Sequence, residues 1–453
     1  MKRFNVIQAA KNVFIASKLP KRAGVSGWVA TLAPRTPQPA LNGPVIADVT
    51  IIGGGFAGLS AARRISRLDP NARVAVLEAG IVGEGPAGAN SGFIIDLPHE
   101  VSSDDFSGES EAKFRQSVLI QRSAIALATE MATENGWGKD VFDPCGRYSV
   151  AISAEGDRHL EDYAQQLSKM GEDHRLLSAS EIDAVTGSPV YTSGLFMPGT
   201  VIVQPAAYIR GVADCLKEPV TLYERSPALS FERLGTGWLV KTPQGSVQAA
   251  KIIMANNGHA ESFGFFRGRL LHVFTYASLT EEFDPSRLGG ERKWAATPAL
   301  PMGTTVRRIS TGAGDRILVR SRYSYNPSIA VSDAAIQRAG RLHDGKFSNR
   351  FPTLGGVGLQ YRWAGAMALT RNHVPAFGEI ERGVFAACGC NGLGASNSTA
   401  SGIAAAELAL GHDSELGRVY ARLAAPTALP PQPFTTIGAK IHLAYREWSA
   451  GSE

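Results

Sequence analysis

The sequence predicts an α/β fold in which two domains are interleaved along the chain. Three observations support this prediction. A β-branched run, a glycine-rich turn and a helical pattern follow one another over residues 47–65, short strand-like segments fill 219–255 and 264–325, and a last strand leads through a second glycine-rich loop into a helix over 383–408. A strand followed by a helix is the unit of a parallel sheet, and 453 residues exceed the usual size of one domain.

The overall composition is that of an ordinary globular protein, with 44% hydrophobic and 19% charged residues. The formal net charge of +5 is spread thinly, and its densest cluster, Lys18, Lys21 and Arg22, is interpreted as solvated surface. A nucleic-acid partner would need a basic stripe with interleaved aromatic residues, so none is expected. The sequence contains no apolar run of about eighteen residues, so no transmembrane segment is expected. Four cysteines without metal-binding spacing predict no metal site and a reduced, cytoplasmic protein.

The N-terminal residues precede the first strong pattern. Residues 33–45 are rich in proline and turn formers, so residues 1–44 are expected to form an arm and a linker. Phe4, Ile7, Val13 and Phe14 could line one face of a short helix. Docking on the protein body is the simpler interpretation of such a helix, and binding to a membrane surface or a partner is the alternative.

The strongest local pattern is a G-x-G-x-x-G turn formed by Gly53, Gly55 and Gly58 between a strand and an amphipathic helix. The first glycine permits the tight turn, the second lets the backbone approach a pyrophosphate, and the third lets the helix pack close to the sheet. The free N–H groups at the start of the helix, which begins near Phe56 and Ala57, would face the phosphates. The turn therefore predicts a dinucleotide-binding site.

A second strand ends at Glu78, about 25 residues after the first glycine of the turn. A carboxylate at this spacing binds the ribose hydroxyls of a dinucleotide, and it would repel the 2′-phosphate of NADP. These residues leave the choice between FAD and NAD open.

Three separated segments resemble, in the same order, the flavin loop, the W-x-G segment and the final glycine loop and helix of the D-amino-acid oxidase superfamily, which includes glycine and sarcosine oxidases. They are residues 80–92 (GIVGEGPAGANSG), 361–378 and 383–408. The resemblance implies a Rossmann-like FAD-binding domain of the glutathione-reductase type, interleaved with an antiparallel-sheet substrate domain. Ala87 and Ala89 depart from the family's flavin loop, where a small hydroxyl residue and an arginine are usual.

The same resemblance implies how the chain is divided and which residues hold FAD without a covalent bond. The FAD-binding domain is expected at 45–112, 185–262 and 352–425, the substrate domain at 113–184 and 263–351, and a C-terminal tail at 426–453. The expected FAD-binding residues are Gly53, Gly55, Phe56, Ala57, Gly58, Glu78, Ala79, Gly88, Asn90, Ser91, Gly92, Pro227, Gly365, Gly389, Asn391, Gly392, Leu393 and Gly394.

The W-x-G segment is most similar to the γ-glutamylputrescine oxidase branch of the family. Members that oxidise α-amino acids usually carry an arginine two residues after Gly365, where this chain has Met367. The resemblance therefore implies a small amine substrate with its acyl or carboxylate group distant from the reacting C–N bond. It also implies that a hydride passes to flavin N5 and that water hydrolyses the resulting imine. The strand 316–325 lacks the oxygen-activating lysine of sarcosine oxidases, so O2 and another electron acceptor both remain open.

Substrate-facing residues are expected just past the flavin loop and on the later strands. His99 and Glu100 follow the loop, and Glu100 could hold a cationic amine. His272 and Tyr276 are four residues apart on a strand and so should share a face. The same alternation pairs Arg320 with Arg322 and Tyr323 with Tyr325, and the arginine pair could bind a carboxylate, phosphonate or phosphate. A surface turn, or a solvated sheet edge, is the alternative for each.

Two other functions remain open from the sequence. An NAD-dependent dehydrogenase would explain residues 47–78 but not 383–408, and a non-catalytic flavoprotein could use the N-terminal arm to dock a partner. The oligomeric state is not predicted.

Overall fold

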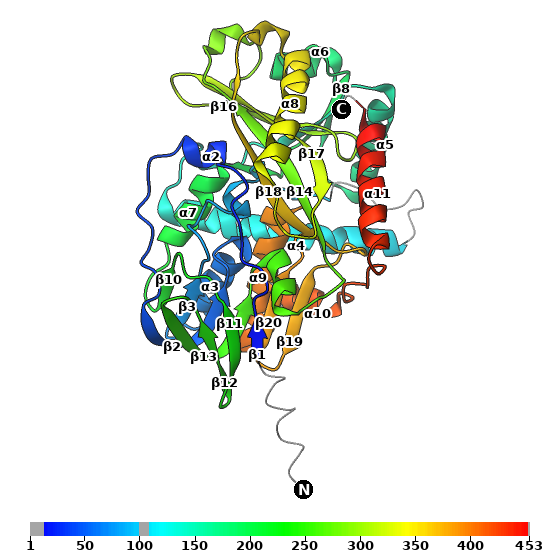
Figure 1. Ribbon diagram of the computed structural model, residues 1–453. Coiled ribbons are helices and arrows are strands. Elements are labelled where there is room, and N and C mark those ends of the chain that lie inside the picture. Colours follow the sequence, from blue (N-terminus) through cyan, green and yellow to red (C-terminus); the bar gives the residue numbers. More distant parts are fainter. Residues whose placement is uncertain (1–12, 99–107, 452–453) are drawn as a thin grey trace.

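The computed structural model describes residues 13–98 and 108–451 (Figure 1), and the side chains of residues 108–110 are not described. Two large sheets lie in its two halves, and three short strands form a small third sheet. The helices of this part of the chain are α2 (Gly27–Ala30), α3 (Phe56–Leu68), α4 (Gly108–Asn135), α5 (Ala154–Met170), α6 (Ala179–Thr186), α7 (Pro205–Asp214), α8 (Asp333–Arg350), α9 (Gly394–Leu410), α10 (Glu415–Arg422) and α11 (Phe434–Ala450).

The first sheet has a parallel centre, as the strand–turn–helix pattern predicts. Its parallel strands lie in the order β20, β13, β2, β3, β10, with bounds Val384–Cys388, Gly245–Met254, Gly43–Ile52, Val74–Leu77 and Val220–Tyr223. Antiparallel strands extend it, namely β19 (Ala376–Glu381) beside β20, and β12 (Gly237–Lys241), β11 (Ser230–Leu234) and β1 (Val13–Ile15) beyond β13.

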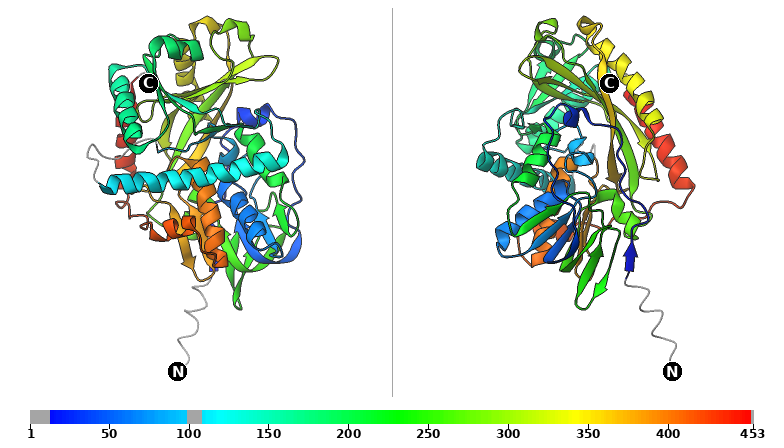
Figure 2. Two further views of the ribbon diagram at one scale, coloured as in Figure 1. Left: turned by 180° about the vertical axis from the view of Figure 1, so that it is seen from behind. Right: turned by 60° about the vertical axis from the view of Figure 1, so that its left-hand side comes forward.

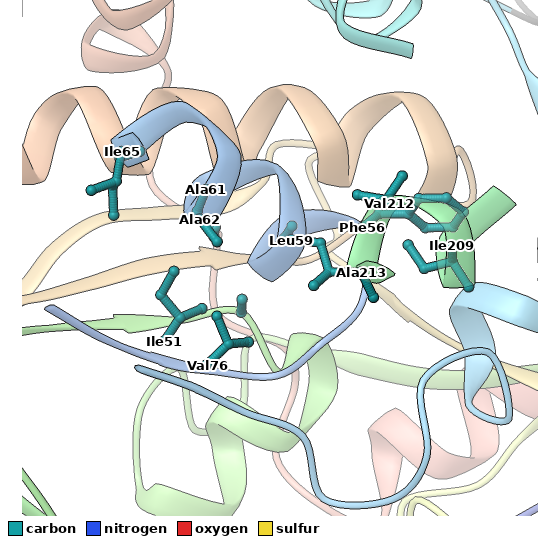
Figure 3. Close-up of a cluster of buried hydrophobic side chains, with 14 of the residues drawn as sticks. Ile51, Phe56, Leu59, Ala61, Ala62, Ile65, Val76, Ile209, Val212 and Ala213 are labelled. Carbon is teal, nitrogen blue, oxygen red and sulfur yellow. The ribbon is translucent and has the colours of Figure 1, made fainter. Parts of the chain in front are cut away.

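A hydrophobic core joins α3 and α9 to the parallel centre of this sheet (Figure 3). Ile51 and Val76 on neighbouring strands face Leu59 and Ile65 of α3, and all four are fully buried. Burying side chains of this size contributes about 1.5–3 kcal/mol each. The core therefore fixes the start of α3 relative to the ends of β2 and β3.

The second sheet has eight strands in the order β18, β14, β17, β16, β15, β6, β8, β7. Every neighbouring pair is antiparallel except β15 and β6. Helix α8 packs over β14, β17 and β18 on one face, and α11 contacts β17. The strand bounds are Leu359–Leu369, Leu271–Thr280, Asp315–Tyr325, Thr305–Ser310, Trp294–Pro298, Arg147–Ala151, Ser193–Met197 and Arg175–Ser178; the small sheet contains β4 (Phe93–Ile94), β9 (Val201–Val203) and β5 (Phe142–Asp143).

Two strands pair with the eight-stranded sheet although the expected division assigns their residues to the FAD-binding domain. They are β18, within 352–425, and β8, within 185–262. The pairing of β18 with β14 runs from Leu271↔Leu369 to Thr280↔Leu359. Local patterning shows that a strand exists but not which sheet it joins, because that choice depends on long-range register. The domain division itself stays a prediction.

Residues 13–44 run along both halves of the molecule. Val13 and Phe14 form β1 and not the expected short helix; Phe4 and Ile7 lie outside the described residues. From β1 the dark-blue chain rises to α2 and then returns to β2 (Figures 1 and 2). Arg35, in the expected linker, forms ion pairs with Asp214 and the fully buried Glu224, and these contacts attach the linker to the first half of the molecule. No helix in the described ranges is long and apolar enough to cross a membrane.

Candidate cofactor and substrate site

The glycine turn between β2 and α3 has the close contacts that its spacing predicts. A Cβ on Gly58 would lie 1.8 Å from the carbonyl oxygen of Gly53, and one on Gly53 would lie 2.6 Å from the carbonyl oxygen of Ala255. Gly53 also has a φ of +116°, which side chains rarely adopt. A Cβ on Gly55 would meet only the Ala87 side chain, at 3.6 Å. Gly53 and Gly58 therefore serve the turn itself, whereas Gly55 leaves space open.

Two helices present uncapped N-termini to this space. Neither α3, whose N-cap is Gly55, nor α9, whose N-cap is Leu393, has a side-chain hydrogen bond at its cap. Helices α5, α6, α7, α8 and α10 all have one. Free N–H groups and the positive end of the helix dipole attract anions, so this pair of helix ends fits the phosphates and the electron-rich edge of a flavin dinucleotide.

Glu78 lies at the end of β3 beside the turn. Its Oε2 accepts the N–H of Gly54 and its Oε1 the N–H of Gly80, both at 2.8 Å. Burial raises the pKa of Glu78, against the backbone hydrogen bonds, which lower it. These two hydrogen bonds fix the carboxylate beside the glycine turn.

One long pocket connects these features to the eight-stranded sheet. It begins at Glu78 and Pro227, passes the turn and the flavin loop, and ends against β14, β16, β17 and β18. Thirteen of the expected FAD-binding residues line it: Gly53, Gly55, Phe56, Ala57, Glu78, Ala79, Asn90, Ser91, Pro227, Gly365, Gly392, Leu393 and Gly394. The two glycine turns, more than three hundred residues apart in sequence, therefore face one space.

The other five expected FAD-binding residues lie behind the pocket wall: Gly58, Gly88, Gly92, Gly389 and Asn391. A Cβ on Gly88 would lie 1.9 Å from the Gly83 carbonyl oxygen, so this glycine allows a close backbone contact. The Asn391 side chain turns away from the pocket, and its Oδ1 accepts the N–H of Thr370 at 2.8 Å. These residues shape the loops that line the pocket.

The far wall of the pocket is built by side chains from three neighbouring strands. Thr275, Thr305 and Arg320 line it, and register places Thr305 directly opposite Arg320. Arg320 donates to the hydroxyl oxygens of Ser91, at 3.3 Å, and Tyr323. Within the described chain, no carboxylate pairs with Arg320, and the hydroxyls of Thr275 and Thr305 have no hydrogen-bond partner.

The expected shared face of Arg320 and Arg322 is wrong, because β17 contains a bulge. Thr275 pairs with Tyr323 while Tyr276 pairs with Ser321, which leaves Arg322 as the extra residue, with a φ of +64°. Arg322 consequently points outward and forms an ion pair with Glu447 of α11. The bulge brings Tyr323 beside Arg320 instead.

The histidine and tyrosine expected on β14 differ in position. His272 lines the pocket, and its Nε2 lies 2.5 Å from Oε2 of Glu261. Burial works to raise the pKa of Glu261, but hydrogen bonds from His272 and the Gly268 N–H hold it below the usual value. Tyr276 does not line the pocket; it is buried against Ile336 of α8, and its hydroxyl lies 2.7 Å from that of Ser324.

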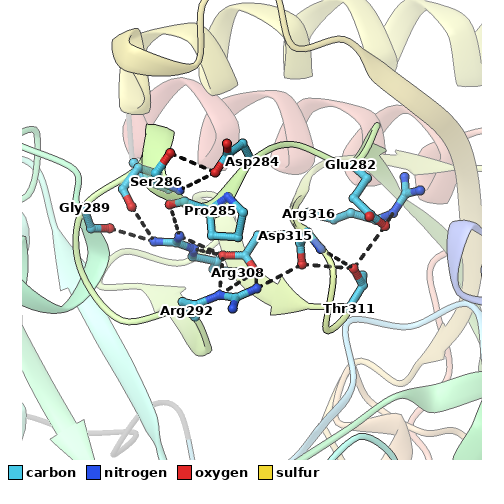
Figure 4. A network of polar contacts seen from close by, with 12 residues as sticks. Glu282, Asp284, Pro285, Ser286, Gly289, Arg292, Arg308, Thr311, Asp315 and Arg316 are labelled. Atoms are coloured by element: carbon cyan, nitrogen blue, oxygen red, sulfur yellow. Dashed lines mark hydrogen bonds and ion pairs between the residues drawn. The ribbon is translucent and has the colours of Figure 1, made fainter.

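Not every arginine of these strands faces the pocket. Arg308 of β16 belongs to a buried network, where it pairs with Asp315 (Figure 4). His99 and Glu100 lie outside the described residues. All four cysteines are free, and Cys390 lines the pocket as a buried side chain.

A dinucleotide turn that opens onto a mostly antiparallel sheet is typical of the class of dinucleotide-dependent oxidoreductases. Within that class, residues 48–408 match the family described as FAD dependent oxidoreductase (DAO). The chain belongs to this family, which confirms the expected superfamily, fold class and FAD cofactor, and makes the protein an enzyme. The alternative of an NAD-dependent dehydrogenase is therefore set aside.

Individual relatives are distant. The chain is 25% identical to the probable oxidoreductase OrdL of Rhizobium meliloti over 410 residues, and 25% identical to the γ-glutamylputrescine oxidoreductase of Escherichia coli over 424 residues; each match covers 88% of this chain and 91% of the relative. Among solved structures it is similar to glycine oxidase from Geobacillus kaustophilus, with a TM-score of 0.67, 19% identity and coverage of 82% and 96%. It is also similar to L-proline dehydrogenase from P. horikoshii, with a TM-score of 0.64, 19% identity and the same coverage of the two chains.

Sequence reasoning missed two parts of the pocket. Residues 18–24 of the N-terminal arm line it; the side chains of Lys18, Lys21 and Arg22 are exposed, which agrees with their interpretation as solvated surface, but that interpretation does not place them at a pocket. Thr305 also lines the pocket, opposite Arg320 on the neighbouring strand. This pairing depends on the register of the two strands, which a local sequence pattern does not reveal.

Proposed function

We propose that the protein oxidises the C–N bond of a small amine whose far end carries an anionic group. The observation that carries this proposal is the continuous pocket between the α3 turn and the wall where Arg320 lies without a carboxylate. Bound FAD supplies the hydride acceptor. The relative from Escherichia coli is named for γ-glutamylputrescine, which is an amine, and this supports the substrate class.

In this proposal the thirteen pocket-lining residues given above hold FAD without a covalent bond. Gly55 leaves room for the pyrophosphate at the start of α3, and Glu78 accepts the ribose hydroxyls. Gly392 and Gly394 meet no atom within 4 Å of an added Cβ, so the second turn also leaves space for the ligand.

Side chains of the pocket wall favour the neutral, reactive form of the amine. Phe274, Ile329 and Met367 line the far part of the pocket and exclude water. Because burial penalises charge, such a wall favours the neutral amine over the ammonium ion, and only the neutral amine has the lone pair that assists hydride release. His272, held by Glu261, is assigned the polar contact with the amine nitrogen.

Arg320 is assigned the anionic end of the substrate. A guanidinium without a carboxylate partner, beside the free hydroxyls of Thr275 and Thr305, offers a charge-assisted site for a carboxylate or phosphonate. Tyr323 holds the guanidinium from the other side. Met367 occupies the position where α-amino-acid oxidases usually place their arginine, so the anion is recognised from β17 rather than β18.

The test is anaerobic bleaching of the bound flavin by matched amines. γ-Glutamyl amines, N-methyl amino acids and aminophosphonates are compared with neutral amines of the same chain length. Arg320→Met should weaken half-saturation by the anionic amines roughly a hundredfold, as expected for one lost charge-assisted pair, and leave neutral amines unchanged. Arg322→Met, two positions along the strand but paired with Glu447, is the control and should match the parent.

The outcomes separate the two halves of the proposal. Bleaching by neutral and anionic amines alike, unchanged in Arg320→Met, would remove the anion site but keep amine oxidation. Absence of bleaching by every amine would remove the proposed function and favour a non-catalytic use of FAD. Admitting air after bleaching then distinguishes an oxidase, which recovers its colour quickly, from a dehydrogenase.

A further inference from the structure

A segment of the N-terminal arm, residues 16–26, crosses the mouth of the pocket and is here called the strap. It is fastened to the first sheet at one end, where the Ala16 N–H donates to the Leu229 carbonyl at 2.8 Å and the Ser17 N–H to the Ser262 carbonyl at 3.0 Å. At the other end the Ala364 N–H of β18 donates to the Ala23 carbonyl at 2.8 Å. The strap therefore bridges both halves of the molecule (Figure 2).

The fastening at the far end is close-packed. Gly24 has a φ of +82°, and a Cβ there would lie 3.0 Å from the Arg362 carbonyl oxygen and 3.2 Å from Cα of Trp363. Just beyond the strap, the indole N–H of Trp28 donates to the Asn90 carbonyl of the flavin loop at 2.8 Å. The chain at this point can leave the pocket only by breaking contacts with β18 and with the flavin loop.

The strap is also the most cationic part of the pocket wall. Lys18, Lys21 and Arg22 all line the pocket. Arg22 neutralises Glu84, another lining residue, at 3.1 Å, and Lys18 donates to the Pro327 carbonyl at 2.8 Å. Lys21 has no acidic partner in the ranges that the structure covers. The two phosphates are the anionic groups of FAD, so cations lining its pocket are complementary to that ligand.

We propose that the strap is a component of the FAD site, which closes over the dinucleotide and contributes Lys18 and Lys21 as cations that attract this anionic ligand. This inference goes beyond the proposed amine chemistry, since it concerns how FAD is retained whatever the substrate. FAD exchange then requires the strap to detach from β18, and release is slowed by both its packing and its charge.

The charge is tested by the rate of FAD release from the holoenzyme, followed as the recovery of flavin fluorescence after dilution. The double variant Lys18→Gln/Lys21→Gln should release FAD about tenfold faster than the parent. Raising salt from about 50 mM to about 500 mM should accelerate release from the parent more than from the variant, because salt screens the lost charges. Lys217→Gln, an exposed lysine outside the pocket, is the control.

The packing is tested by Gly24→Val. This side chain should push the strap off β18 and accelerate FAD release on the order of tenfold, from loss of a few contacts and backbone strain. Gly171→Val carries the same kind of strain, with a φ of +74° and no neighbour within 4 Å, and should release FAD as the parent does. Unfolding of each apoprotein shows whether the fold survives. Parent-like release from both the lysine and the glycine variants would overturn the inference.

Discussion

The two ends of the pocket are built in different ways. At the nucleotide end, the wall is mostly backbone, namely the turn at Gly53–Gly58 and the uncapped starts of α3 and α9. The Glu78 side chain there is itself held by two backbone N–H groups. At the sheet end, side chains from separate strands form the wall, and a bulge at Arg322 decides which of them face inward. The nucleotide end therefore depends on local backbone geometry, and the sheet end on long-range register.

The largest effect expected from this difference is at the turn itself. Gly58→Val would place a Cβ 1.8 Å from the Gly53 carbonyl, so the start of α3 must move, at a cost on the order of 4 kcal/mol or more. Gly55→Val meets only the Ala87 side chain at 3.6 Å and fills the space for the phosphates. We expect Gly58→Val to unfold at markedly lower denaturant and Gly55→Val to purify folded but colourless.

The measurements are apoprotein unfolding and flavin absorbance. Equal loss of stability in both variants would show that Gly55 is a structural glycine as well, and a folded Gly55→Val that keeps its flavin would show that the open space beside Gly55 has no role in binding.

A smaller effect is expected at Glu78. Glu78→Ala removes the acceptor proposed for the ribose, and two charge-assisted hydrogen bonds correspond to roughly a thousandfold weaker FAD binding. The same change leaves the N–H groups of Gly54 and Gly80 without their acceptor. Glu78→Gln keeps one acceptor oxygen and should recover part of the affinity. Full flavin occupancy of Glu78→Ala after dialysis would contradict the assignment.

The sequence predicts the nucleotide end well because its determinants are contiguous. Gly53, Gly55 and Gly58 are set by a six-residue motif, and all carry the contacts or the space that the motif requires. At the sheet end, the same local reasoning mispredicts which side chains face the pocket. Strict alternation pairs Arg320 with Arg322, but one inserted residue turns Arg322 toward Glu447 and brings Tyr323 to Arg320. A bulge is fixed by the partner strand, so this chain's local pattern could not reveal it.

Helix α8 provides a further contrast, because residues beneath it that do not line the pocket serve the stability of the fold. His343 of α8 is fully buried there, and its Nδ1 lies 2.8 Å from the Ser278 hydroxyl. Burial lowers the pKa of His343 from 6.5 to about 4. A folded-state pKa below the unfolded value gives stability that is present above about pH 6.5 and is lost as the pH falls toward 4.

The expected loss of unfolding free energy from this group is at most about 3 kcal/mol over that window. His343→Gln keeps an acceptor for Ser278 and should remove this part of the pH dependence, as measured by urea unfolding at several pH values. An unchanged slope between pH 6.5 and 4 would show that His343 does not titrate with unfolding.

The smallest effect is expected at Tyr276, which the sequence placed beside the substrate and the structure places beneath α8. Tyr276→Phe removes the hydrogen bond to Ser324 and should cost about 1 kcal/mol of stability, the usual net value of one such bond. Flavin bleaching should be unchanged, because Tyr276 does not line the pocket and its ring packs against Ile336. Tyr323→Phe, on the pocket side, should instead loosen Arg320 and weaken binding of anionic amines. If Tyr276→Phe slowed bleaching as much as Tyr323→Phe, Tyr276 would contribute to substrate recognition, and the assignment of a purely stabilising role to its hydroxyl would be wrong.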